Sequence, residues 1–125
     1  MTKEAALYDF WGKFGIPRYE ENTVPTGQDA PKFPYITYQV VTDSFGGEVA
    51  LTASLWYRSD SWTAINAKAE EISRYIGRGG TVIIVDDGAI WIKRGQPFAQ
   101  SMGDDSDDAI RRKYLNLTAE FITAD

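Results

Sequence analysis

The chain has 125 residues, with 18 acidic and 13 basic side chains and neither cysteine nor histidine. Without cysteine it has no disulfide framework and no thiolate metal site, and without histidine it lacks the commonest general base and metal ligand at neutral pH. Its formal net charge of −5 argues against a tight grip on nucleic acid, because Lys and Arg hold phosphate backbones.

The first 16 residues predict an N-terminal amphipathic helix over residues 3–14. Large apolar side chains recur at the spacing of one helix face: Leu7, Phe10, Trp11 and Phe14. Thr2 is a candidate N-cap, and Gly15 is placed to close the helix.

Residues 17–34 predict a long connection of extended character. Prolines recur among polar residues at Pro17, Pro25, Pro31 and Pro34. Proline removes hydrogen-bond donors from a strand, and no apolar period is visible in this segment. A connection of this length inside a compact domain is typical of a functional or mobile segment.

Two strands are expected next, at 35–41 and 48–58. The first is rich in aromatic and β-branched residues, and in the second every other residue from Val49 to Tyr57 is apolar. The alternation places Leu55 on the core face and Trp56 and Arg58 on the opposite face. The two runs predict an antiparallel hairpin.

The segment 62–76 gives the clearest helix pattern of the chain. Its apolar positions are spaced by three and four residues: Trp62, Ile65, Ala69, Ile72 and Ile76. Ser59, Asp60 and Ser61 are candidate N-caps, and Gly77 ends the pattern.

The remaining chain predicts short strands. Runs at 82–85 and 89–93 flank Asp86-Asp87-Gly88, and an Asp-Gly pair accepts the positive φ angles of a type I′ hairpin turn. Residues 97–102 predict another short strand. Residues 115–121 alternate between apolar and polar side chains and predict the last strand.

Together these elements predict the α+β class, because hairpins rather than repeated βα units indicate an antiparallel sheet. We expect a mostly antiparallel β-sheet of about four to five strands with two main α-helices packed on one face. Residues 1–125 are predicted to form a single domain, with an N-terminal helix at 1–16, an extended loop at 17–34, and a sheet over 35–125 that carries the central helix 62–76.

Candidate chemical motifs have simpler explanations. The acidic loop 104–108 lacks the Gly and Glu positions of an EF-hand, and Gly77–Gly80 follows a helix, whereas phosphate-binding loops precede one. The serines have no histidine to activate them. We therefore predict no catalytic, cofactor-binding or metal-binding residues, and a protein that is not an enzyme.

Contact surfaces are the better expectation, since the chain has four Trp, seven Tyr and six Phe, residues that suit both a core and an interface. A basic cluster follows the acidic loop directly, which predicts either a charge-complementary contact between subunits or a solvated strand end. Trp56 is either a contact residue or is covered by the 17–34 segment. The candidate interface residues are Trp56, Arg58, Asp104, Asp105, Asp107, Asp108, Arg111, Arg112 and Lys113.

Three short motifs resemble one protein family: Phe14-Gly15-Ile16-Pro17, Glu21-Asn22-Thr23-Val24-Pro25 and Phe33-Pro34-Tyr35-Ile36-Thr37-Tyr38. They resemble the tail-terminator or tail-completion proteins, also called head-tail joining proteins, of long-tailed bacteriophages and prophages. The resemblance implies a homo-oligomeric ring, typically a hexamer, that caps the tail tube and joins it to the head connector. It further implies DNA passing through the lumen without specific binding, and no cofactor. A neighbouring neck protein of similar size also fits.

The resemblance places the protein in the virion, at the head-proximal end of the tail, and in the host cytoplasm during assembly. No apolar run reaches the roughly 18 residues that cross a bilayer, so no membrane partner is expected. Residues 1–4 lack the features of a signal peptide. The alternative function is a small-ligand or regulatory binding module, with an aromatic pocket between sheet and helix lined by Trp56, Trp62 and Trp91.

Overall fold

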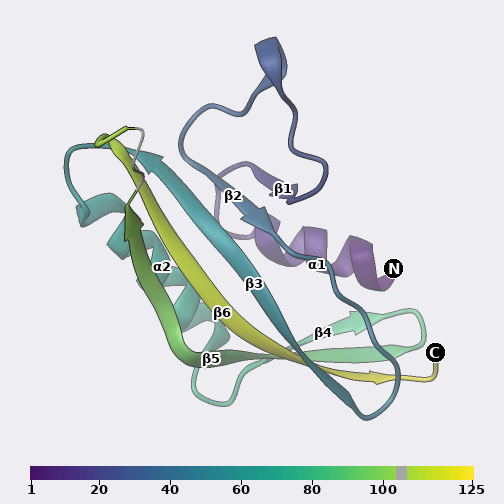
Figure 1. Ribbon diagram of the computed structural model, residues 1–125. Coiled ribbons are helices and arrows are strands. Elements are labelled where there is room, and N and C mark those ends of the chain that lie inside the picture. Colours follow the sequence, from purple (N-terminus) through teal and green to yellow (C-terminus); the bar gives the residue numbers. More distant parts are fainter. Residues whose placement is uncertain (104–106) are drawn as a thin grey trace.

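The computed structural model describes residues 1–103 and 107–125 as two α-helices packed against a six-stranded sheet (Figure 1). In chain order the elements are α1 (Lys3–Gly12), β1 (Arg18–Glu20), the 3-10 turn η1 (Gly27–Asp29), β2 (Tyr35–Tyr38), β3 (Gly47–Arg58), α2 (Thr63–Ile76), β4 (Thr81–Val85), β5 (Gly88–Gly103) and β6 (Ile110–Thr123). The strand order is β1-β2-β3-β6-β5-β4, in which β1 and β2 are parallel and all other neighbours are antiparallel.

The predicted α+β class is confirmed, but the sheet differs from the predicted one in detail. It has six strands rather than four to five, and it is mixed because β1 pairs in parallel with β2. Strand β1 lies inside the 17–34 segment that was predicted as a loop. It is only three residues long, too short to show an alternating pattern.

The longest strands pair over most of their length and set the two faces of the sheet. Strands β3 and β6 run antiparallel from Gly47 opposite Phe121 to Arg58 opposite Ile110. In β3 the side chains of Leu51 and Leu55 are buried in the core that both helices share. The alternate residues of β3 face away from the helices, on what we call the outer face.

Both helices contribute to one core on the inner face of the sheet. Phe10 of α1 and Phe14, just after α1, contact the ring of Tyr75 in α2, with ring centroids 6.1 and 5.5 Å apart. Trp11 stacks on Tyr38 of β2 at 6.2 Å. Figure 1 shows both helices behind the sheet, which leaves the outer face uncovered by helix.

Local signals account for three of the four helix boundaries, whereas α1, predicted over residues 3–14, ends earlier, at Gly12. The hydroxyl of Thr2 accepts a hydrogen bond from the Ala5 amide at 3.1 Å, as an N-cap does, and α2 ends at Gly77. The Ser61 hydroxyl accepts from the Thr63 amide at 3.1 Å, just before α2. Within the described residues, neither helix has the length and apolar character needed to span a membrane.

Candidate functional site

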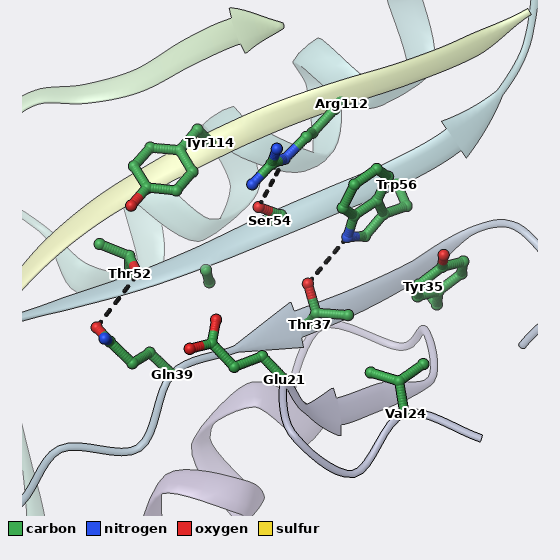
Figure 2. Close-up of a pocket in the computed structure, with 11 residues that line it drawn as sticks. Glu21, Val24, Tyr35, Thr37, Gln39, Thr52, Ser54, Trp56, Arg112 and Tyr114 are labelled. Atoms are coloured by element: carbon green, nitrogen blue, oxygen red, sulfur yellow. Dashed lines mark hydrogen bonds between the residues drawn. The ribbon is translucent and has the colours of Figure 1, made fainter. Parts of the chain in front are cut away.

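The outer face carries a cleft of about 500 Å³ over β2, β3 and β6 (Figure 2). Its floor contains the hydroxyl residues Thr37 and Ser54, and Arg112 and Tyr114 of β6 stand along one side. Glu21, from the segment that follows β1, lies at the opposite side. The cleft therefore combines residues that are far apart in the sequence and meet only through strand pairing.

Strand register aligns a row of large side chains across the cleft. Tyr35 of β2 lies opposite Trp56 of β3, which lies opposite Arg112 of β6. The rings of Tyr35 and Trp56 stack at 6.2 Å with an interplanar angle of 16°. The Arg112 guanidinium lies 4.8 Å from the centroid of the Trp56 ring and 5.5 Å from that of Tyr114. Cation–π attraction thus holds the Arg112 guanidinium in place.

Two hydrogen bonds fix this row to the floor of the cleft. The Trp56 indole N–H donates to the Thr37 hydroxyl at 2.9 Å, and Arg112 Nε donates to the Ser54 hydroxyl at 3.1 Å. Ser54 is 4% exposed. Each hydroxyl accepts one bond and keeps its own hydrogen for donation. Within the described residues, the two terminal nitrogens of Arg112 have no hydrogen-bond or ion-pair partner.

The other two residues of the basic cluster lie on the inner face. The Arg111 guanidinium lies 5.2 Å from the ring centroid of Trp62, and it donates to the backbone carbonyl of Asp108. Lys113 Nζ donates to Asn66 Oδ1 of α2 at 2.6 Å. Of the three basic residues, Arg112 is therefore the one whose side chain lies on the outer face.

The acidic loop is partly engaged within the same chain. Asp107 forms an ion pair with Arg58 at 2.8 Å, and the Arg58 guanidinium also lies 5.3 Å from the ring of Phe33. Asp108 is exposed, while Asp104 and Asp105 lie outside the described residues. The structure thus places Arg58 and Asp107 in an intrachain pair.

The predicted pocket between sheet and helix is not formed by the three tryptophans. Trp56 and Trp91 point to the outer face, as their register with Arg112 and Glu120 shows, and Trp62 directly precedes α2. Only Trp56 lines the cleft described above. The sequence pattern placed Trp56 on the face of its strand opposite Leu55, but the positions of the three tryptophans relative to one another depend on long-range pairing.

A second feature of the outer face was missed by the sequence analysis. Val82 and Ile84 of the edge strand β4 are 55% and 73% exposed, and Ile122 of β6 is 41% exposed. Ile84 and Ile122 both lie opposite Ala89 of β5, so they belong to one row. We call Val82, Ile84 and Ile122 the β4 patch. The sequence feature that could have indicated this patch is the apolar run 82–85, a pattern typical of a strand covered on both faces.

A charged cluster separates the cleft from the β4 patch. Lys93 Nζ lies 2.7 Å from Glu48 and 3.9 Å from Glu120. The hydrogen bond that Lys93 donates to Glu48 raises the pKa of Lys93 above its ordinary value of 10.5. This cluster lies in exposed or half-exposed positions, where such pairs contribute little to folding stability.

Comparison of the sequence with protein-family models and with curated proteins found no match. In the described part of the chain, no group of three or more acidic side chains is arranged to hold a metal ion.

Proposed function

We propose that the protein is a structural subunit of a long-tailed phage tail, a tail terminator whose copies form a ring. The ring caps the tail tube and joins it to the head connector, at the head-proximal end of the virion, after assembly in the host cytoplasm. Its subunits perform no catalysis and hold no cofactor. The observation that carries the proposal is the outer face, which is uncovered by helix and bears both the aromatic cleft and the β4 patch.

The composition of this face supports a role in protein contacts. Aromatic side chains and arginine are enriched in interfaces, and large exposed apolar groups in a cluster mark contact sites. Trp56 and Arg112 supply the first kind of group, and Val82 and Ile84 supply the second. Two different surfaces on one subunit suit a ring, in which each copy contacts one neighbour through one surface and the other neighbour through a different surface.

The charge of the chain supports a lumen that DNA crosses without being gripped. A net charge of −5 repels the phosphate backbone, whereas binding would require clustered cations. The basic cluster of β6 does not supply such a patch, because Arg111 and Lys113 pack against Trp62 on the inner face.

The native mass tests the ring. Light scattering at low micromolar concentration and electron microscopy should show a closed oligomer of uniform mass, alone or with tail-tube protein. The double variant Val82→Ser with Ile84→Ser should weaken assembly, whereas Glu70→Ser, at an exposed position of α2 away from the outer face, should not. A strictly monomeric protein under both conditions would contradict the proposal.

A second candidate, a small-ligand binding module, is favoured by the volume of the cleft. Ligand pockets occupy about 300–1,000 Å³, and this cleft of about 500 Å³ falls within that range. Trp56 would report occupancy through its fluorescence. A panel of small carboxylates that quenches the fluorescence of the native protein, but not that of a Trp56→Phe variant, would favour this candidate.

A further inference from the structure

Arg112 is held in place but its terminal nitrogens lack a partner. Its Nε is bonded to Ser54, and its guanidinium is packed against Trp56 and Tyr114. A guanidinium presents a planar fork of donors that matches the two oxygens of a carboxylate. The orientation of the Arg112 guanidinium is already fixed, so binding a carboxylate in the cleft costs little additional side-chain entropy at Arg112.

The surrounding groups favour a singly charged anion. Ser54, beside Arg112, and Thr37, beside Trp56, each accept a bond from the row and have a hydroxyl hydrogen left to donate in the cleft. Glu21 lies across the cleft and repels negative charge (Figure 2). One arginine opposed by one glutamate suits a carboxylate better than a doubly charged phosphate.

The chain itself offers a carboxylate on a projecting element. Residues 26–30 are exposed, and Figure 1 shows the turn η1 standing away from the sheet. Pro25 and Pro31 flank the turn and restrict its backbone, and the Ala30 amide bonds to the Gly27 carbonyl at 3.2 Å. Asp29 lies in this turn, and its carboxylate has no partner within the described residues.

The position of Asp29 on a projecting turn distinguishes it from the other exposed acidic residues. A carboxylate on a flat surface cannot reach the floor of a cleft, whereas one at the end of a restricted arm can. We propose that Asp29 of one copy enters the outer-face cleft of a neighbouring copy and pairs with its Arg112. The contact joins unlike surfaces and so propagates around a ring. It presupposes the ring assembly proposed above, and it assigns Trp56 the role of positioning Arg112.

Substitutions of Asp29 test the contact without disturbing the fold, because the turn is exposed. We expect Asp29→Asn and Asp29→Lys to lower the association constant about tenfold or more, measured by sedimentation or light scattering. Asp60→Lys is the matched control, since it makes the same charge change at another exposed residue without a partner in the described chain. It should assemble as the native protein does.

Reversing both charges tests the pairing itself. Arg112→Asp alone should weaken assembly, and its combination with Asp29→Arg should restore a large part of it. Arg112 also supports Trp56 and Ser54, so thermal unfolding must be recorded for each variant. If Arg112→Asp fails to fold, the Asp29 variants and their control still decide the question.

A crosslink between copies gives an independent readout, because the chain has no cysteine of its own. Asp29→Cys protein mixed with Thr52→Cys protein, whose substituted residue lines the cleft, should form a disulfide-linked pair under mild oxidation. Either variant alone should remain largely unlinked. A native protein that never oligomerises would overturn both the ring and this contact. An oligomeric native protein that is unaffected by Asp29→Lys would overturn the contact and leave the ring standing.

Discussion

Gly88 is the first residue of β5, at a point where β6 passes close to the chain. Its φ angle of 153° is one that side-chain-bearing residues rarely adopt, and a Cβ atom there would overlap the carbonyl oxygen of Ile122. The sequence predicted a glycine that permits a tight turn. The structure adds that this glycine also makes room for a neighbouring strand.

Replacing Gly88 with alanine should therefore destabilise the protein by about 2–4 kcal/mol, from backbone strain combined with the clash against β6. Urea denaturation would measure the loss. Gly79→Ala is the matched control, since a Cβ there meets no atom within 4 Å, and it should change stability by less than about 0.5 kcal/mol. Equal effects at both positions would contradict the close approach of Ile122.

The site was only partly predictable at the level of residues. The alternation in 48–58 was enough to place Trp56 and Arg58 on the face opposite Leu55, and the β3 register agrees. The role of Arg112 was not predictable, because its neighbour Trp56 is 56 positions away and their contact depends on the β3–β6 register. Pairing over that distance leaves no local pattern in the sequence.

At the scale of elements, α2 shows why a regular spacing of apolar residues predicts a helix and its buried face reliably. Ile72 is 0% exposed and faces the sheet, as its spacing in the apolar series indicated. Ile72→Ala should cost about 2–5 kcal/mol in the free energy of unfolding, because it leaves a cavity in a packed core.

The same helix offers the control. Glu70 pairs with Arg74 at 3.2 Å, but the two side chains are 70% and 80% exposed. Such a pair is screened by water, so Glu70→Ala should change the free energy of unfolding by about 0.5 kcal/mol or less. Thermal or urea denaturation of both variants checks the contrast, which would fail if Glu70→Ala proved as costly as Ile72→Ala.

Two elements escaped prediction for physical reasons. Strand β1 is three residues long and gains its place from parallel pairing with β2, which no local propensity encodes. The predicted strands 89–93 and 97–102 are one strand, β5, interrupted by an irregularity between Arg94 and Ala99. Gly95 and Pro97 interrupt the local strand pattern in the sequence, whereas the strand itself accommodates them in a bulge.

At the scale of the whole molecule, α1 ties together the two outermost strands of the sheet. It packs against both β1 and β4. Arg18 of β1 donates to the Tyr8 carbonyl at 3.0 Å, and the Asp86 amide after β4 donates to the Met1 carbonyl at 2.9 Å. Helical cover of this kind protects sheet edges from unwanted pairing. The outer face is therefore the broad surface of the sheet left open to partners.

The titration of the folded molecule predicts a loss of stability in alkali. Burial raises the pKa values of the Tyr35, Tyr38 and Tyr57 phenols above their ordinary 10.0, and the Glu48 hydrogen bond raises the pKa of Lys93. Above about pH 10 the unfolded chain therefore binds fewer protons than the folded chain at these four groups. The stability they contribute is present below pH 10 and is lost as the pH rises through the folded pKa values.

Urea midpoints measured from pH 8 to pH 11 should thus be level at first and fall above about pH 10. Tyr38→Phe removes one of the buried phenols, since Tyr38 is 3% exposed, and should make the alkaline fall shallower. Phe45→Leu is the control, because Phe45 is 75% exposed and has no titratable group, and it should leave the slope unchanged. The phenolate absorbance of the folded native protein minus that of Tyr38→Phe should place the ionisation of Tyr38 above its ordinary pKa of 10.0, and an unshifted difference titration would contradict its burial.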